Sequence, residues 1–157
     1  MIAFANDKNQ CIKLSSQNYQ FPDLDDDTDE YDANWLLVDI EVIDNLQNWK
    51  TTDAFLLSSD WLSIAQWFSD VAQFKALKQN ALGFIEPNLT FQLVKYNKAD
   101  KTIDFDIELS LECVPPFCKN KSEAKYSFCF TQNECKKISE MCREEYKKFP
   151  ERNVKRK

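Results

Sequence analysis

The chain has 157 residues, of which 43% are hydrophobic and 29% are charged, and its formal net charge is −6. This length and apolar content suffice for one hydrophobic core, so we expect a single domain over residues 1–157. The negative charge disfavours contact with phosphates and argues against nucleic acid as a direct partner. The sequence has neither the roughly 20 apolar residues of a membrane span nor a signal peptide. We therefore expect a cytoplasmic protein with no membrane partner, and we favour a monomer.

Six cysteines and no histidine limit the metal chemistry of the chain. Thiols stay reduced in the cytosol, so no disulfide framework is expected. A zinc site needs four Cys or His ligands, usually with a C-x-x-C pair, and the sequence has no such pair. Asp23, Asp25 and Asp27 fall at the first, third and fifth places of an EF-hand loop. However, Thr28 replaces the glycine of place six and Asn34 the glutamate of place twelve. We predict no metal and no cofactor.

The first part of the chain is predicted to form three strands. A strand over Cys11–Phe21 ends at Pro22, which cannot donate to a ladder. The segment Trp35–Ile43 is apolar and β-branched at its start and alternates afterwards, which predicts a strand buried on both faces where it begins. A short third strand is predicted at Phe55–Leu57.

A helix is predicted from Asp60 to about Leu77. Ser58 or Ser59 would supply the N-cap oxygen, and the charge of Asp60 suits the positive end of the helix dipole. Trp67 and Phe74 lie at the edge of the apolar stripe, where they either widen the core contact or stand exposed, and we favour the core. The stripe itself is predicted to consist of Trp61, Ile64, Ala65, Phe68, Val71 and Ala72.

The second half of the chain repeats the order of strands followed by a helix. Leu89–Leu93 and Ile103–Glu112 both alternate apolar and polar residues, and a short hairpin connection pairs them antiparallel. Tyr126–Phe130 continues this pattern. Thr131 and Glu134 then have the spacing of a capping box, which begins a second helix. The apolar stripe of that helix is Cys135, Ile138, Cys142, Tyr146 and Phe149.

Together these elements predict an α+β fold, with a mainly antiparallel sheet of about six strands packed on one face by two helices. No internal repeat and no Gly/Ser linker divides the chain. Residues 150–157 are basic and are expected to form a frayed tail.

Acidic residues gather in two places. Asp104, Asp106, Glu108 and Glu112 lie on the polar face of the predicted strand Ile103–Glu112. The second group has no compensating Lys or Arg and is predicted to be an exposed loop whose negative field favours a basic partner, although a charge run is often no more than a solvated loop. It comprises the seven carboxylates Asp23, Asp25, Asp26, Asp27, Asp29, Glu30 and Asp32.

Catalytic signatures are missing from the sequence. Without histidine, a cysteine nucleophile lacks its usual base, and neither a G-x-S-x-G motif nor a phosphate-binding glycine loop is present. Paired carboxylates leave a small carboxylate-dependent hydrolase as a remote alternative, but no pair is singled out by an apolar pocket. We therefore predict a protein that binds a partner and is not an enzyme.

Five short segments of the chain form a distinctive series. They are Y-Q-F-P at Tyr19–Pro22, Y-D-A-N-W-L at Tyr31–Leu36, S-S-D-W-L-S-I-A-Q-W at Ser58–Trp67, F-I-E-P-N-L-T-F at Phe84–Phe91 and S-L-E at Ser110–Glu112. In this order they resemble the WapI-type immunity proteins. The resemblance implies a bacterial cytoplasmic antitoxin that is encoded beside a secreted polymorphic or contact-dependent toxin and binds it. It gives no toxin-binding residue by position, and it leaves the cysteine-rich C-terminal third unexplained.

Charge and resemblance predict the same function, the neutralisation of a cognate toxin domain. Many such toxins are nucleases, which are basic because they bind phosphates, and an acidic inhibitor associates with them quickly. Tyr31 is the predicted apolar anchor, unless Tyr31 and Trp35 pack beneath the loop. The alternative function is an adaptor or regulatory domain that binds another basic protein through the same surface. The predicted binding residues are the seven carboxylates of the run, Tyr31, Asp104, Asp106 and Glu108.

Overall fold

Two four-stranded antiparallel sheets and two helices make up the part of the chain that the computed structural model describes, residues 1–120 and 122–154. The first sheet has the order β1-β2-β3-β4 and the second has the order β5-β6-β7-β8. The strands of the first sheet are β1 (Ile2–Ala5), β2 (Gln10–Tyr19), β3 (Trp35–Asp44) and β4 (Gln47–Leu57). Those of the second are β5 (Ala81–Leu82), β6 (Leu89–Asn97), β7 (Thr102–Ser110) and β8 (Glu123–Thr131).

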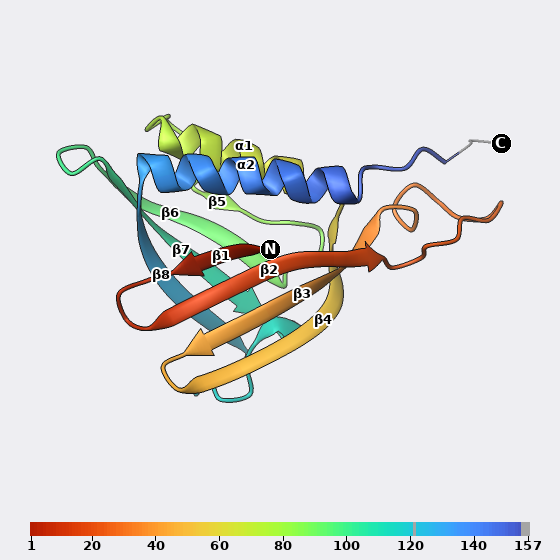
Figure 1. The fold of residues 1–157 in the computed structure, drawn as a ribbon, viewed down its shortest axis with the longest axis horizontal. Helices are drawn as coiled ribbons and strands as arrows, with labels where there is room; N and C mark the ends of the chain where they lie inside the picture. Colours follow the sequence, from red (N-terminus) through yellow and green to blue (C-terminus); the bar gives the residue numbers. More distant parts are fainter. Residues whose placement is uncertain (121, 155–157) are drawn as a thin grey trace.

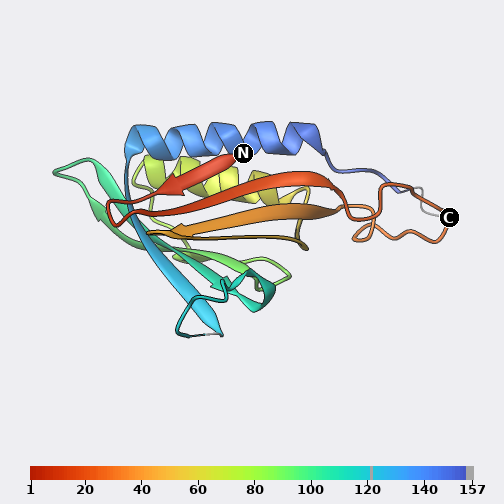
Figure 2. The same cartoon turned by 60° about the horizontal axis from the view of Figure 1, so that its bottom comes forward.

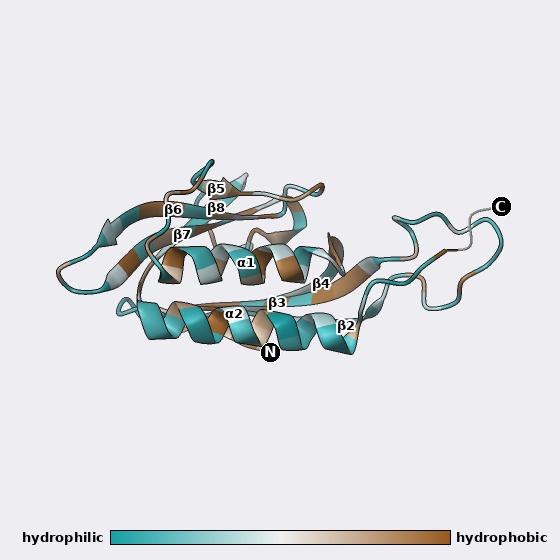
Figure 3. Cartoon of the chain, turned by 90° about the horizontal axis from the view of Figure 1, so that it is seen from above, coloured by the Kyte–Doolittle hydropathy of each residue, from teal (hydrophilic) through white to brown (hydrophobic). Residues whose placement is uncertain are grey.

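The helices are α1 (Asp60–Ala72), which connects the two sheets, and α2 (Gln132–Lys148), which follows β8 directly. Figure 1 shows them side by side and running in opposite directions. Seen from above (Figure 3), α1 lies between α2 and the second sheet, and the outer side of α2 is largely hydrophilic. A short 3₁₀ turn, η1 (Leu111–Cys113), lies between β7 and β8.

The predicted α+β class is confirmed, but the prediction of one sheet of about six strands is wrong. The strands on either side of α1 pair only within their own half of the chain, so the helix separates two sheets. Alternation along a strand shows which face is buried and does not show which sheet the strand joins. The strands β1 and β5 are also absent from the prediction, because four and two residues are too few for alternation to mark them.

Most of β4 is likewise absent from the prediction, which marks only Phe55–Leu57. The residues of β4 before Phe55 are exposed or half-buried, so no buried alternation reveals them. Pairing with β3 holds them in the sheet, from the pair Asp44 and Gln47 onward. The turn between the two strands is tight because Asn45 takes the left-handed conformation, with φ 56°, which asparagine tolerates.

One hydrophobic core joins both sheets to α1. The ring centroid of Phe4 on β1 lies 5.8 Å from that of Phe68 on α1, 5.9 Å from that of Phe91 on β6 and 6.3 Å from that of Phe105 on β7. All four side chains are fully buried. The favoured core placement of Trp67 is confirmed, since its side chain is buried among the same rings.

The helix α1 begins where the sequence predicts but ends earlier, at Ala72. Phe74 takes φ 54°, the left-handed conformation that usually follows a helix at a glycine, and the amide of Lys75 donates to the Asp70 carbonyl at 3.1 Å. A phenylalanine at this place gives no sequence signal for the helix end. The predicted N-cap bond is wrong as well, because the side chain of Ser59 makes no capping hydrogen bond.

The predicted start of α2 is confirmed. The Glu134 amide donates to the Thr131 hydroxyl at 3.1 Å, and the Thr131 amide donates to the Glu134 carboxylate at 2.8 Å, which completes the capping box. The expected stripe faces the core: Cys135, Ile138 and Cys142 are buried, and Tyr146 and Phe149 are partly buried and pack against the core at its edge.

A buried carboxylate joins α2 to the first sheet. Glu145 is 2% exposed, accepts a hydrogen bond from the Ser16 amide at 3.1 Å, and pairs with Lys148 at 2.6 Å and with the amino group of Met1 at 3.0 Å. Burial raises the pKa of Glu145, but these donors outweigh it, so the pKa lies below its ordinary value. The carboxylate is therefore ionised in the folded protein at neutral pH.

All six cysteines are free thiols. Cys113, Cys135 and Cys142 are buried, whereas Cys129 on β8 is exposed. Burial raises the pKa of Cys113 and of Cys135 to about 12 and raises that of Cys142 as well. The three buried thiols therefore stay protonated and pack as small hydrophobic side chains, as predicted for the pair on α2.

Two of the segments that carry the family resemblance lie against each other. The Asn88 carbonyl, in E-P-N-L, accepts from the Ser110 amide at 3.0 Å, and the Asn88 side chain donates to the Glu112 carboxylate at 2.9 Å. Asn88 is 3% exposed. The strand β7 ends at Ser110 and does not continue to Glu112 as predicted, because Leu111 turns the chain with φ 54°.

Candidate functional site

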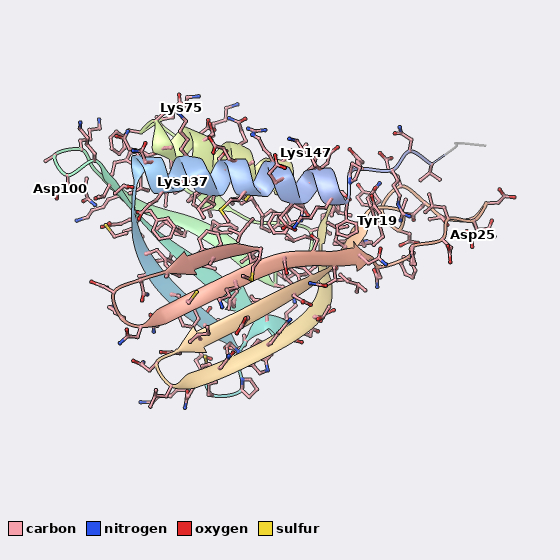
Figure 4. The ribbon with its side chains drawn as sticks, viewed as in Figure 1. Tyr19, Asp25, Lys75, Asp100, Lys137 and Lys147 are labelled. Atoms are coloured by element: carbon pink, nitrogen blue, oxygen red, sulfur yellow. The ribbon has the colours of Figure 1, made fainter. Side chains whose placement is uncertain are left out.

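The predicted acidic run lies in the connection between β2 and β3, residues 20–34, which we call the acidic loop. Figures 1 and 2 show this segment extending from one end of the molecule, beyond the ends of the strands. In Figure 4, Asp25 lies toward the far end of the loop and Asp100 lies at the opposite end of the molecule. All seven carboxylate residues of the loop are exposed, so the negative charge faces solvent.

Hydrogen bonds within the loop shape its tip. The Thr28 hydroxyl donates to the Asp25 carboxylate at 2.7 Å, and the Asp27 amide donates to the same carboxylate at 3.0 Å. These two donors hold the pKa of Asp25 below its ordinary value. Nearer to β3, the Asp32 amide donates to the Asp29 carboxylate at 2.8 Å. The carboxylates thus order the backbone through their own acceptor oxygens, as Asx turns do.

The base of the loop is closed by residues that are distant in the sequence. The side-chain amide of Asn34 donates to the Glu30 carbonyl at 2.9 Å and to the Arg152 carbonyl at 3.1 Å. In return, the Arg152 amide donates to the Asn34 side chain at 2.7 Å. The Gln20 amide donates to the Trp35 carbonyl at 2.8 Å, which continues the ladder between β2 and β3.

The expectation of a frayed tail over residues 150–157 is wrong at Arg152. Its guanidinium donates to the carbonyls of Phe21, Pro22 and Ala33, and it stacks over the Tyr19 ring at 3.7 Å from the centroid. Residues 155–157 lie outside the described residues. Nothing in the sequence distinguishes Arg152 from the other cations near the C-terminus, so sequence reasoning missed it.

Apolar side chains lie among the carboxylates. Tyr31 is 57% exposed, Phe21 44% and Leu24 41%. Tyr31 does not pack beneath the loop, whereas Trp35, at the start of β3, is half-buried. Phe21 and Leu24 are absent from the predicted site, although an apolar residue inside a run of carboxylates is a signal that could have found them. The loop therefore combines negative charge with apolar contact area.

The second predicted acidic group lies in a different place, on the outer face of the second sheet, and lysines lie close to its carboxylates. Asp104 is half-buried and lies 3.9 Å from Lys95, and Asp106 is 8% exposed and lies 3.8 Å from Lys125. The Ser127 hydroxyl also donates to Asp106 at 2.6 Å. Glu108 is half-buried on the same face and lies opposite Lys125 in the strand register, so two lysines partly offset the three carboxylates.

A groove of about 540 Å³ borders this face. Asp104 and Asp106 line it together with Lys8 and Lys125, so both signs of charge are present in it. The structure therefore does not join Asp104, Asp106 and Glu108 to the acidic loop as one negative surface.

In residues 1–120 and 122–154 we find no group of three or more Asp, Glu, Cys or His side chains placed so that they could hold a metal ion. The described chain also has no helix with the length and apolar character needed to cross a membrane. The arrangement that remains is an exposed acidic loop with apolar side chains on a braced base, which can bind a basic protein surface.

Comparison with known proteins identifies the family. No curated protein matches the chain. A match to the Immunity protein WapI-like family extends over residues 2–150, which include both sheets, both helices and the acidic loop. This match confirms the resemblance carried by the five sequence segments, and the chain belongs to the Immunity protein WapI-like family.

Proposed function

We propose that this protein neutralises a cognate bacterial toxin, a basic nuclease domain, by binding it through the acidic loop. Membership of the immunity family supports the toxin as partner. The observation that carries the choice of surface is the exposure of all seven loop carboxylates at one end of the molecule. The protein acts in the cytoplasm as a binding partner and needs no cofactor.

Charge favours the loop over other surfaces. Between Lys13 and Lys50 the chain has no Lys or Arg, so every ionised side chain that the loop itself contributes is negative. A nuclease domain is positive where it meets phosphates. Opposite fields steer two proteins together and raise the association rate, by roughly 10- to 1000-fold at low salt.

Residence time needs more than charge, because rim charges act mainly on association. Tyr31, Phe21 and Leu24 supply apolar area within the loop, and Tyr31 is the most exposed of the three. Tyrosine is a frequent anchor because it buries a large ring and keeps a polar hydroxyl. We assign Tyr31 the role of anchor.

The test is stopped-flow association with the toxin domain encoded beside the gene, at low and at physiological salt. In the test variant Asp25, Asp26, Asp27 and Asp29 are changed to Asn. Asparagine keeps an acceptor oxygen, so the loop's hydrogen bonds can persist. The control variant makes the same change in net charge at exposed carboxylates elsewhere, with Asp7→Asn, Asp100→Asn, Glu123→Gln and Glu140→Gln.

We expect the loop variant to associate at least about tenfold more slowly at low salt and to lose most of the salt dependence. The control should stay close to the wild-type rate. Equal rates for the loop variant and wild type, with unchanged protection of toxin-exposed cells, would refute the assignment of the loop.

The anchor is tested separately through dissociation. Tyr31→Ala should raise the dissociation rate by about tenfold or more with little change in association, while Tyr31→Phe should stay near wild type because it keeps the ring. A normal dissociation rate for Tyr31→Ala would remove Tyr31 from the binding surface.

A further inference from the structure

We propose that Arg152 is a positioning residue that holds the acidic loop in the shape that binds the toxin. This inference rests on the proposed function of the loop and adds a residue that the family match, which ends at residue 150, does not include. The acidic loop would then depend for its shape on a cation contributed by the C-terminal segment.

The guanidinium joins both ends of the loop. Its Nη1 donates to the Pro22 carbonyl at 2.9 Å and its Nη2 to the Phe21 carbonyl at 2.8 Å, where the chain leaves β2. Its Nε donates to the Ala33 carbonyl at 2.8 Å, just before β3, and Nη2 also contacts that oxygen. One planar side chain therefore fixes the separation between the entry and the exit of the loop.

The segment that carries Arg152 is itself held in place. The Tyr19 hydroxyl donates to the Pro150 carbonyl at 2.6 Å, and the Tyr19 ring meets the Phe149 ring edge-on with centroids 5.5 Å apart. The buried Asn34 side chain exchanges two hydrogen bonds with the Arg152 backbone. Figures 1 and 2 show the segment after α2 running toward the acidic loop.

Arginine suits this position for geometric reasons. Its five N–H donors form a rigid fork, whereas the lysine ammonium is a single point that cannot reach separated acceptors at once. Seven carboxylates in one loop repel each other, so the free loop tends to expand. A brace at its base reduces the number of shapes the loop must give up when a partner binds.

Positioning and steering predict opposite effects when Arg152 is removed. Arg152→Gln makes the surface around the loop more negative by one charge. If only charge governs binding, a basic toxin should then associate faster. If Arg152 positions the loop, the toxin should bind more weakly despite the added negative charge.

The experiment compares wild type, Arg152→Lys, Arg152→Gln and the control Lys147→Gln, which removes one positive charge from the exposed side of α2. Hydrogen exchange in the free protein reports on loop order through the amides of Asp32, Ala33 and Asn34, which are hydrogen-bonded within the loop. The dissociation constant for the adjacent toxin domain is measured for the same four proteins.

We expect these loop amides to exchange roughly 10- to 100-fold faster in both Arg152 variants, because charge-assisted hydrogen bonds are lost in each. Core amides of α1 should be unchanged, and the toxin should bind about tenfold more weakly to both variants. The agreement of Arg152→Lys with Arg152→Gln is decisive, since only the second changes the charge. Lys147→Gln should match wild type in every measurement.

Three results would overturn the proposal: unchanged loop exchange in Arg152→Gln, wild-type behaviour of Arg152→Lys, or faster association with tighter binding in Arg152→Gln. If Arg152→Gln also speeds exchange of the core amides, Tyr19→Phe serves as the test variant in its place. Tyr19→Phe loses only the hydrogen bond to the Pro150 carbonyl and should speed exchange of the loop amides a few-fold. Exchange is measured without toxin, so failure of the loop as toxin-binding site would not be confused with failure of the brace.

Discussion

Phe68 on α1 offers the most direct test of the core. Its side chain is fully buried, and its ring centroid lies 5.8 Å from that of Phe4, 5.5 Å from that of Phe91 and 5.4 Å from that of Phe105. Phe68→Ala removes a ring that contacts β1, β6 and β7 at once, so the cavity cannot close by moving one element. We expect the free energy of unfolding to fall by about 3 to 5 kcal/mol, from lost transfer free energy and from the cavity.

Thermal unfolding followed by circular dichroism measures this loss. For a domain of this size, 1 kcal/mol corresponds to a shift in Tm of roughly 2 to 4 °C, so the expected decrease is about 6 to 20 °C. The matched control is Phe21→Ala, the same substitution at a side chain that is 44% exposed, and it should cost less than about 1 kcal/mol. A decrease below about 1 °C for Phe68→Ala would mean that the core does not join the two sheets through α1.

Three further predictions concern a helix cap, a buried charge and the thiols. Thr131→Ala should cost about 1 kcal/mol in urea unfolding, and Ser59→Ala much less, because only the threonine caps its helix through its side chain. Folding lowers the pKa of Glu145 below its ordinary value of 4.5. The ionised carboxylate therefore stabilises the protein when the pH is above 4.5, and this stabilisation is lost as the pH falls through the lowered pKa. The difference in unfolding free energy between wild type and Glu145→Gln should therefore shrink from about pH 7 to about pH 3, and a constant difference would contradict the pairing. A thiol reagent should modify the exposed Cys129 in the native protein well before the buried cysteines and should titrate all six after denaturation, whereas a lower total would indicate disulfides.

Sequence patterns predict an element well where a local rule and the tertiary structure agree. The second helix satisfies both, because Thr131 and Glu134 form the capping box whose spacing announces them. The first helix departs from the local rules for helix ends. Ser59 is at the N-cap position but its side chain makes no capping hydrogen bond, and Phe74 takes the left-handed conformation expected of glycine. The end of a helix and the assignment of strands to two sheets depend on packing between distant segments, which no local window contains.

The candidate site divides in the same way. The exposure of the acidic loop follows from composition, since so many carboxylates cannot be buried together. The contacts of Arg152 with the Phe21 and Ala33 carbonyls do not follow from composition. They depend on the tertiary structure, which places the C-terminal segment beside the loop. The lysines opposite Asp104 and Asp106 also lie on neighbouring strands, so their compensation of the acidic sheet face depends on strand register.

The contact between E-P-N-L and S-L-E bears on how such a protein could acquire a new partner. Asn88 of E-P-N-L is buried and hydrogen-bonded to Ser110 and Glu112 of S-L-E, so replacing it disturbs the packing of the second sheet whatever the toxin. The acidic side chains at the far end of the molecule face solvent and can be exchanged at little cost in folding. If the acidic loop binds the toxin as proposed, partner choice can change at this end of the molecule while the packing of the second sheet stays the same.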